Sequence, residues 1–188
     1  RRGYIWAVDL EDGDLQGWGR AYGDSIRTPP SFADVNSDGY LEVMVVDKNN
    51  RTWVVLRSGA VAQGWPRSSH GCGLAEWDAE FYPPDITIPV SPPIVGDIDG
   101  DGRLEILQGS LFQCIVGWQG DGEDVNGFPL SLGGGCSSVA IGDLYGNGMT
   151  EIVAGGGDGY LYAFLHPDSV AIQDARLLPW PTAYGSPK

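Results

Sequence analysis

The sequence predicts an all-β chain built from repeated four-stranded units, and three observations carry this prediction. First, its 188 residues include 29 Gly, 13 Pro, 7 Trp and 8 Tyr, a composition that favours short strands and tight turns over helices. Second, an acidic nine-residue pattern occurs three times. Third, short aromatic–aliphatic runs lie between turn residues along the chain.

The acidic pattern occupies residues 34–42, 97–105 and 143–151. Each copy starts with Asp, has Gly at its sixth position and ends with Glu. A small residue precedes each copy and an apolar run follows it, as in Val43-Met44-Val45-Val46. Because the flanking residues have strand character, we expect each acidic loop to connect a first strand to a second strand.

A second marker follows the first two acidic loops at a constant distance. Gly64-Trp65-Pro66 and Gly127-Phe128-Pro129 each begin 30 residues after the first Asp of the preceding loop. Gly17-Trp18 and Pro179-Trp180-Pro181 are further copies. The interval between Gly64 and the second acidic loop is longer than the equivalent intervals, and it predicts an inserted loop over residues 72–88.

Four short strands per unit, repeated about every 45 residues, are typical of the blades of a β-propeller. We expect strand one to end at the acidic loop, strand two to begin at its Glu, strand three to be the aromatic–aliphatic run, and strand four to carry the Gly-Trp/Phe-Pro marker. The chain is then a single partial propeller of about 3.5 blades. Its predicted parts are the outer strands of one blade at 1–19, full blades at 20–66, 67–130 and 131–182, and a tail at 183–188.

With these loops and markers, nearly the whole chain resembles the FG-GAP/VCBS-repeat family of calcium-binding β-propellers, which are related to the head of the integrin α-subunit. The resemblance implies a calcium-stabilised module that is secreted or at the cell surface, extracellular or periplasmic. Propellers of this family usually close with about seven blades. The lower count here predicts a fragment, or a chain that pairs with other material.

The acidic loops offer oxygen ligands at alternate positions, which suits a hard cation such as Ca²⁺. Positions 1, 3 and 5 offer side chains, position 7 offers its carbonyl, and the Glu at position 9 returns from strand two. In the third loop a Tyr stands at position 3, so a water or a carbonyl must fill that place. The candidate ligands are Asp34, Asn36, Asp38, Tyr40 and Glu42 in the first loop, Asp97, Asp99, Asp101, Arg103 and Glu105 in the second, and Asp143, Tyr145, Asn147, Met149 and Glu151 in the third.

Clusters of Asp, Asn and Gly also form ordinary turns without any ion. Three copies in register favour calcium, and we expect about three structural ions, each holding the turn between strands one and two. The loops contain three, four and two carboxylates in chain order. Since ligand charge tunes calcium affinity, we expect the second loop to bind most tightly and the third most weakly.

The formal net charge of −14 limits the classes of partner. So acidic a surface repels phosphate groups, which argues against nucleic acids and anionic membranes. The sequence has no apolar run long enough to span a membrane. Bound calcium would offset part of the negative charge, because the loops hold nine of the 25 acidic residues.

The three cysteines, Cys72, Cys114 and Cys136, are all expected on the face opposite the acidic loops. Outside the cytosol disulfides persist, so we expect one bridge, either Cys114–Cys136 or Cys72–Cys114. The alternative is three reduced, buried thiols. Their spacing does not match a zinc site.

The inserted loop lies on the same predicted face as the cysteines. It carries three aromatic and four acidic residues, and Trp77 is its candidate ligand contact. The alternative is a lid over a neighbouring blade. The two histidines, His70 and His166, have no metal or triad spacing and are expected at the surface. We therefore predict no enzymatic activity.

Three functions fit these features. The first is a non-catalytic extracellular module for protein–protein interaction or adhesion. The second is a carbohydrate-binding, lectin-like propeller, and the third is a propeller domain of a secreted polysaccharide-degrading enzyme. The partner, protein or glycan, is not determined by the sequence. The outer strands at 1–19 leave an open edge, which predicts self-association or a completing chain at the N-terminal half blade.

Overall fold

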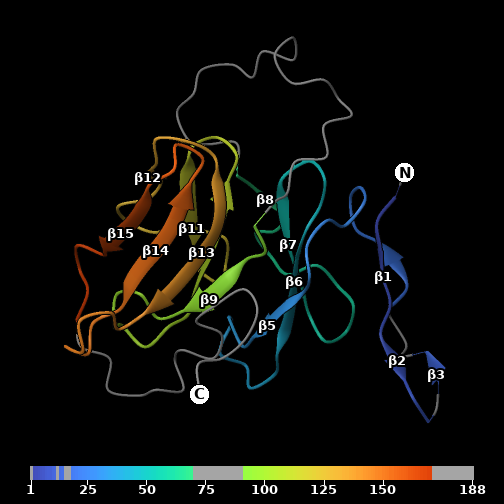
Figure 1. Ribbon diagram of the computed structural model, residues 1–188. Coiled ribbons are helices and arrows are strands. Elements are labelled where there is room, and N and C mark those ends of the chain that lie inside the picture. The colour runs from blue at the N-terminus through green and yellow to red at the C-terminus, as the bar shows by residue number, and fades with distance from the viewer. Residues whose placement is uncertain (1, 12, 15–17, 70–90, 171–188) are drawn as a thin grey trace.

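The computed structural model describes residues 2–11, 13–14, 18–69 and 91–170, and in these residues the chain forms strands and turns without any helix. The predicted all-β class is thereby confirmed (Figure 1). The strands are β1 (Tyr4–Ile5), β2 (Val8–Asp9), β3 (Gly13–Asp14), β4 (Arg20–Ala21), β5 (Ser31–Ala33), β6 (Glu42–Val46), β7 (Arg51–Val55), β8 (Arg67–Ser68), β9 (Ile94–Gly96), β10 (Glu105–Ser110), β11 (Cys114–Trp118), β12 (Leu130–Ser131), β13 (Cys136–Gly142), β14 (Glu151–Gly156) and β15 (Leu161–Leu165).

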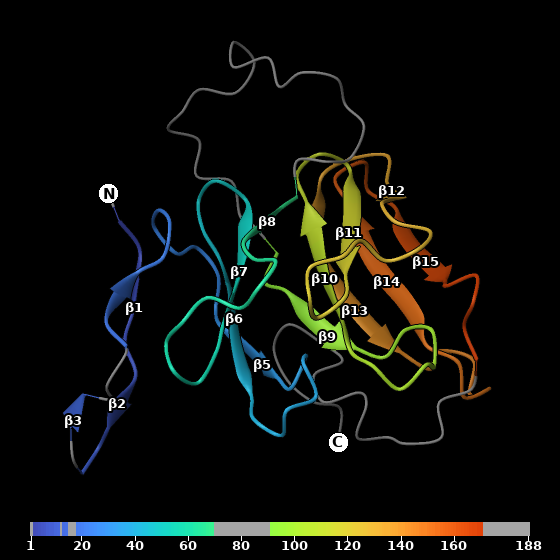
Figure 2. The same cartoon turned by 180° about the vertical axis from the view of Figure 1, so that it is seen from behind.

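The strands form consecutive antiparallel sheets that follow the order of the chain. Strands β5–β8 and β9–β12 make two four-stranded sheets, and β13–β15 make a three-stranded sheet. Strand β1 pairs with β4, and β2 pairs with β3, as the two halves of one hairpin. Figures 1 and 2 show the hairpin and the three sheets side by side in this order. The arrangement is that of successive propeller blades, as the repeat predicts.

The N-terminal hairpin has the same register as the outer hairpins of the two complete sheets. In all three hairpins the same two pairings occur, with the same number of residues between the paired partners. The pairs are Tyr4 with Ala21 and Val8 with Asp14 in the N-terminal hairpin, Arg51 with Ser68 and Val55 with Val61 in the next sheet, and Cys114 with Ser131 and Trp118 with Asp124 in the sheet after it. The hairpin therefore corresponds to strands three and four of a blade. Its fourth strand, β4, lies just beyond the range 1–19 that the sequence analysis assigns to the outer strands.

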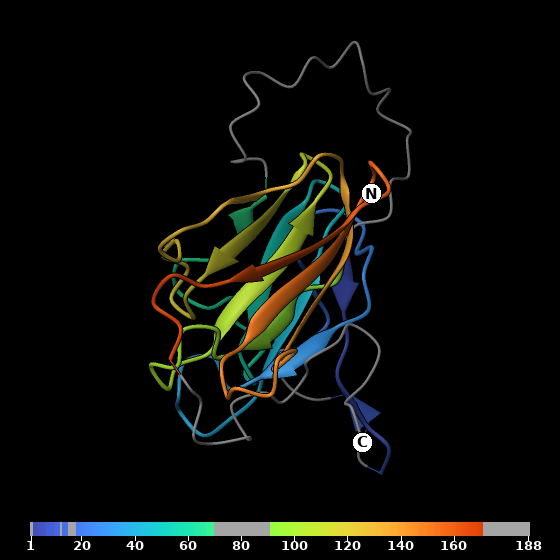
Figure 3. The same ribbon diagram turned by 60° about the vertical axis from the view of Figure 1, so that its left-hand side comes forward.

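The middle sheet lies between the other two sheets (Figure 3). It is buried on both faces because a hydrophobic core lies on each side of it. In β10, Ile106 packs into the core shared with the β5–β8 sheet, and the next residue, Leu107, packs into the core shared with the β13–β15 sheet. Strand β11 alternates in the same way, with Ile115 on one side and Val116 on the other. This alternation follows from the two-residue period of a strand.

The Gly-Trp/Phe-Pro marker is the turn that precedes strand four and not part of that strand. Gly64 and Gly127 both have positive φ, and the Trp65–Pro66 and Phe128–Pro129 peptides are cis. The fourth strands, β8 and β12, begin directly after this turn. They pair with β7 and β11, so β8 ends two residues beyond the boundary expected after residue 66 and β12 one residue beyond that expected after residue 130. A positive φ at glycine and a cis bond to proline suit a turn and would interrupt a strand.

Some sequence predictions fall outside the described residues. These are the inserted loop over 72–88 with Cys72 and Trp77, the last marker at 179–181, and the tail at 183–188. The described residues contain no helix with the length and apolar character that a membrane span needs.

Candidate metal-binding loops

The three acidic loops occupy equivalent places in the three sheets. They connect β5 to β6, β9 to β10 and β13 to β14, and so all of them lie between strand one and strand two (Figure 1). Strands one and two pair directly on either side of each loop, as Ala33 with Glu42 and Gly96 with Glu105 show. This pairing fixes both ends of the loop, so the loop residues between them must turn tightly.

The Glu at position 9 is buried in every loop. Glu42, Glu105 and Glu151 are 1%, 0% and 2% exposed. In each case the Oε2 atom accepts a hydrogen bond from the backbone N–H of position 2, at 3.1 Å from Val35, 3.0 Å from Ile98 and 2.7 Å from Leu144. The Glu therefore points back into the loop from the start of strand two, as predicted.

The Asp at position 1 organises the turn through its two carboxylate oxygens. Both oxygens of each Asp accept backbone N–H groups of positions 4 to 6. The donors are Asp38 and Gly39 for Asp34, Gly100 and Gly102 for Asp97, and Asn147 and Gly148 for Asp143, at 2.6–3.0 Å. These bonds are the side-chain-to-backbone chemistry of Asx turns. They explain the shape of the loop, and by themselves they require no ion.

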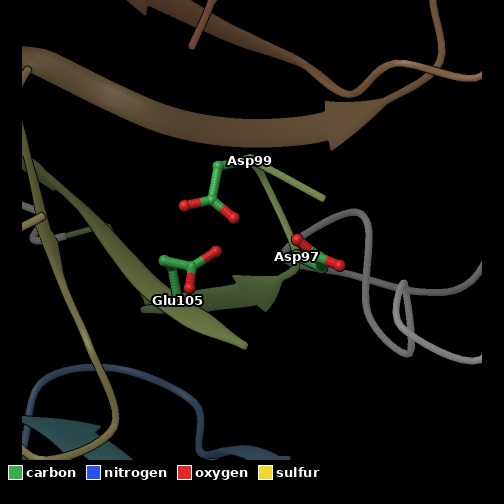
Figure 4. Close-up of side chains that lie close together, drawn as sticks. All are labelled: Asp97, Asp99 and Glu105. Carbon is green, nitrogen blue, oxygen red and sulfur yellow. The ribbon is translucent and has the colours of Figure 1, made fainter. Parts of the chain in front are cut away.

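The second loop brings three carboxyl groups together. One oxygen each of Asp97, Asp99 and Glu105 lies within 4.8 Å of the other two. Figure 4 shows these side chains facing a common space beside the turn. Asp97 and Glu105 are both fully buried, so that two of the three groups are removed from water. Asp101, the fourth acidic residue of this loop, is exposed and does not belong to the group.

Two of the buried glutamates have an oxygen with nothing to bind. The Oε1 atoms of Glu105 and Glu151 are inaccessible to solvent and have no hydrogen-bond partner among the residues that the structure describes. A buried carboxylate oxygen without a partner is costly, since it has lost its hydration without compensation. Both atoms belong to acidic loops, where a cation would be the natural partner.

The pKa values of the loop carboxyl groups are shifted in different directions in different loops. Burial, with a smaller contribution from Asp99, Asp97 and Asp101, raises the pKa of Glu105 to about 8. Burial also raises the pKa of Asp97 and of Glu42. By contrast, the backbone N–H of Gly148 holds the pKa of exposed Asp143 below its usual value. The carboxylates of the second loop are therefore the ones that most lack a positive partner.

Position 4 of the loop is conformationally special, which the sequence pattern did not indicate. Its residue has positive φ in all three loops: Ser37 at 58°, Gly100 at 82° and Gly146 at 68°. The predicted glycine at position 6 also has positive φ in each loop. Two left-handed residues within three positions explain why the loops are so rich in glycine. The first loop accommodates a serine at one of them.

Both tyrosines among the predicted ligands of the first and third loops are solvent-exposed. The side chain of Tyr145 is 74% exposed, so it does not fill position 3 of the third loop. Tyr40 is 52% exposed, and the guanidinium of Arg57 stacks on its ring at 4.2 Å. In the first and third loops an Asn replaces one carboxylate. The side-chain oxygen of this Asn accepts a backbone N–H within the same loop, from Asp38 to Asn36 and from Met149 to Asn147, at 2.9 Å in both.

Cys136 is a free, buried thiol, and the predicted Cys114–Cys136 pairing is therefore wrong. Its Sγ atom packs against Gly109 of the neighbouring sheet, and burial raises its pKa to about 11. Cys114 is disulfide-bonded. Cys72 lies outside the described residues, so the Cys72–Cys114 pairing stays a prediction.

His166 is buried and not at the surface, which corrects the expectation from the sequence. It is 4% exposed, and its ring stacks on Phe128 with the ring centres 6.3 Å apart. Its Nε2 lies 2.8 Å from the carbonyl oxygen of Asn126, and Nδ1 accepts the N–H of Asp168. The ring joins the last described sheet to the one before it. His70 lies outside the described residues.

The marker tryptophans Trp18 and Trp65 join neighbouring sheets. Trp65 donates its Nε1–H to the carbonyl oxygen of Gly120 at 2.9 Å and packs edge-on against Trp118. Trp18 makes the equivalent bond to the carbonyl oxygen of Arg57 at 3.0 Å.

A hollow of about 520 Å³ lies between the β5–β8 sheet and the β9–β12 sheet. Its lining residues include Arg67, Trp118, Asp124 and Phe128. Trp118 is only 2% exposed there, so its ring is part of the core.

Comparisons with known proteins agree with the resemblance seen in the sequence. Residues 34–107 match the family model of the FG-GAP-like repeat. This span runs from the first residue of the first acidic loop into β10, and so contains the first two loops. A search of the curated proteins found no match. The family match shows that residues 34–107 are similar to FG-GAP-like repeats, and the order of the four-stranded sheets agrees with propeller blades.

Proposed function

We propose that this chain is a calcium-stabilised, non-catalytic extracellular propeller module for protein–protein interaction or adhesion. The observation that carries the calcium part is the second acidic loop. There the oxygens of Asp97, Asp99 and Glu105 converge within 4.8 Å, and the Oε1 atom of Glu105 is buried without a partner.

A cation is the partner that fits this arrangement best. Burial, and to a smaller extent repulsion from the neighbouring Asp97 and Asp99, raises the pKa of Glu105. A positive ion would offset both effects. A hard divalent ion such as Ca²⁺ prefers oxygen ligands of this kind and tolerates irregular coordination. Backbone N–H groups already fix the positions of Asp97 and Asp99, so the ligands are held in place before an ion arrives.

The proposed role of the ion is structural. Each loop closes the turn between strand one and strand two, and a bound ion would tie the two strands together at that end. The second loop is the proposed high-affinity site because it has the most carboxylates and the deepest burial. The third loop is the proposed weakest site, since it has the fewest carboxylates and its Asp143 is exposed.

An interaction role is supported by the surface of the N-terminal hairpin. Tyr4, Trp6, Val8 and Leu10 are all at least half exposed, at 50%, 60%, 56% and 98%. Several large apolar side chains on one small hairpin are typical of a surface that contacts another protein. The family match supports a propeller-type module for this purpose.

Calcium uptake tests the proposal directly. We expect the chelator-treated protein to take up about three ions, measured by calorimetric titration and by metal analysis after gel filtration. We also expect the midpoint of thermal unfolding to be higher in millimolar calcium than in chelator, because an ion that binds only the folded state stabilises it. Magnesium at the same ionic strength is the control. Superimposable melting curves together with no calcium uptake would refute the structural calcium.

A further inference from the structure

The sequence contains two Asn-Gly pairs, Asn126-Gly127 and Asn147-Gly148. This dipeptide is chemically labile, because the glycine has no side chain to hinder the attack of its own backbone nitrogen on the Asn side-chain amide. The two pairs are alike in their local geometry. Both asparagines are exposed, and the glycines that follow them have φ angles of 81° and 82°. Their hydrogen bonds differ, and this difference separates a protected pair from a reactive one.

The pair in the third acidic loop is held by hydrogen bonds on both of its reacting groups. The N–H of Gly148 donates to Oδ2 of Asp143 at 2.8 Å, and the side-chain oxygen of Asn147 accepts the N–H of Met149 at 2.9 Å. To react, the nitrogen of Gly148 must lose its proton. A carboxylate that accepts this proton in a hydrogen bond opposes the step, because it places negative charge beside the nitrogen.

The pair before β12 has a free backbone nitrogen. The turn is closed by a bond from the N–H of Phe128 to the carbonyl oxygen of Val125 at 3.2 Å. Among the described residues, none accepts the N–H of Gly127. Asn126 and Gly127 are both exposed, so that water and hydroxide reach them. The nitrogen that must attack is therefore neither shielded nor bound.

His166 also activates the peptide group of this pair. Its Nδ1 accepts the N–H of Asp168, so its Nε2 carries the proton and donates to the carbonyl oxygen of Asn126 at 2.8 Å. That oxygen belongs to the same peptide group as the nitrogen of Gly127. A donor on a peptide oxygen draws electron density away from the nitrogen and makes its proton easier to remove. Because His166 is 4% exposed, this donor is fixed in place.

We propose that Asn126-Gly127 is a site of spontaneous covalent modification, at which the side-chain amide of Asn126 becomes a carboxyl group while Asn147 is spared. Hydroxide removes the proton from the nitrogen of Gly127, and this nitrogen forms a bond to Cγ of Asn126. The Cγ–Nδ2 bond then breaks, and ammonia leaves with a proton taken from water. Water opens the resulting cyclic imide at Cγ or at the main-chain carbonyl carbon, which gives an aspartyl or an isoaspartyl group. The net reaction consumes water, releases ammonia and involves no oxidation.

The modification changes a contact between two sheets. The Nδ2 of Asn126 donates to Oδ2 of Asp168 at 3.1 Å. After the reaction this donor is gone, and a second carboxylate faces that of Asp168. Repulsion between the two weakens the join that His166 makes between the β9–β12 sheet and the β13–β15 sheet. The inference goes beyond the proposed function and does not depend on calcium binding.

Ageing the full chain tests the proposal. The folded protein is kept in millimolar calcium at mildly alkaline pH, digested in acid, and each Asn peptide is weighed by mass spectrometry for the change from amide to acid. We expect conversion at Asn126 at least about 10-fold faster than at Asn147, since a hydrogen bond to a charged group must first be broken at Gly148. The same ageing in urea is the matched control. Without the fold, the two pairs should react at similar rates.

Two variants separate the parts of the proposal. Asn126→Gln keeps the amide but would need a larger ring, so it should remain unconverted at this position and leave Asn147 unchanged. His166→Phe removes the donor to the carbonyl of Asn126 and keeps an aromatic ring against Phe128. It should slow conversion at Asn126. Conversion that is equal or faster in this variant would remove His166 from the reaction.

Asn126→Asp copies the aspartyl product and tests its consequence. It should lower the midpoint of thermal unfolding, and the difference from the parent should shrink in high salt, because salt screens the repulsion from Asp168. An unchanged midpoint would refute the weakened join. Equal conversion of Asn126 and Asn147 in the folded chain, or faster conversion of Asn147, would overturn the assignment of the site. Neither result concerns calcium uptake, so a failure here is distinguishable from a failure of the calcium proposal.

Discussion

The hydroxyl of Thr150 donates a hydrogen bond to the carbonyl oxygen of Asp97 at 3.2 Å, and this bond joins the third acidic loop to the first residue of the second. Thr150 is 1% exposed and occupies position 8 of its own loop. The N–H of Val170 adds a second link, to the carbonyl oxygen of Asp99 at 2.9 Å. The backbone of the second loop is therefore held partly by the sheet that follows it.

Thr150→Val should weaken calcium binding at the second loop and lower stability. Valine keeps the shape of threonine but leaves the buried carbonyl of Asp97 without this donor, which costs about 1 kcal/mol. We expect urea unfolding to show this loss, and a calcium titration to show a weaker high-affinity site. Ser31→Ala is the control, because it removes a bond between sheets, to the carbonyl of Pro93, away from the acidic loops. An unchanged titration for Thr150→Val would show that the loops are independent.

Glu105→Gln should have opposite consequences with and without calcium. In chelator the amide replaces a buried carboxyl that has an unpartnered oxygen, so we expect stability to stay equal or rise. In calcium the variant loses a charged ligand, and it should lose the ion's stabilisation, about 3 kcal/mol at 100-fold excess over the dissociation constant. Thermal unfolding in both conditions checks this. Asp121→Asn, in an exposed turn outside the acidic loops, is the control and should respond equally in both. A variant as calcium-sensitive as the parent would remove Glu105 from the site.

The repeat made much of this fold predictable from the sequence. An acidic loop of fixed length, with Gly at position 6 and Glu at position 9, defines its own hydrogen bonds and the strands on either side of it. For this reason the position of Glu105 at the start of β10 agrees with the prediction. The hairpin at the N-terminus is predictable in the same way, because its marker and its aromatic run repeat those of complete units.

Contacts between residues far apart in the sequence were not predictable in this way. His166 has turn-like neighbours in the sequence, and its burial depends on Phe128, which comes from the preceding sheet. Cys136 packs against Gly109 in the same manner, so its thiol lies beside a backbone and not beside a second thiol. Position 4 of the loops escaped notice because Ser37 in the first copy obscures the preference for glycine.

Gly102→Ala should destabilise the chain through its backbone alone. Gly102 has a φ of +89°, and a Cβ atom there would meet no other atom within 4 Å. The strain of a left-handed alanine is about 1–2 kcal/mol. Gly142→Ala is the matched control, since a Cβ there also meets nothing, and its φ lies outside the left-handed range. Chemical unfolding of both variants should show a loss for Gly102→Ala only, and equal stabilities would contradict the strained turn.

Gly109 and Cys136 form a contact that a double-mutant cycle can measure. A Cβ atom on Gly109 would lie 2.4 Å from the Sγ of Cys136 and 2.9 Å from its Cβ, across the core between the second and third sheets. Gly109→Ala alone should cost about 1–3 kcal/mol from overpacking. In the background of Cys136→Ala the sulfur is absent and the closest of these contacts is removed, although the Cβ of residue 136 stays near, so the same change should cost at least about 0.5 kcal/mol less. Urea unfolding of the four proteins gives the coupling. If the two costs simply add, the sheets do not meet at this point, and the packing of β10 against β13 described here is wrong.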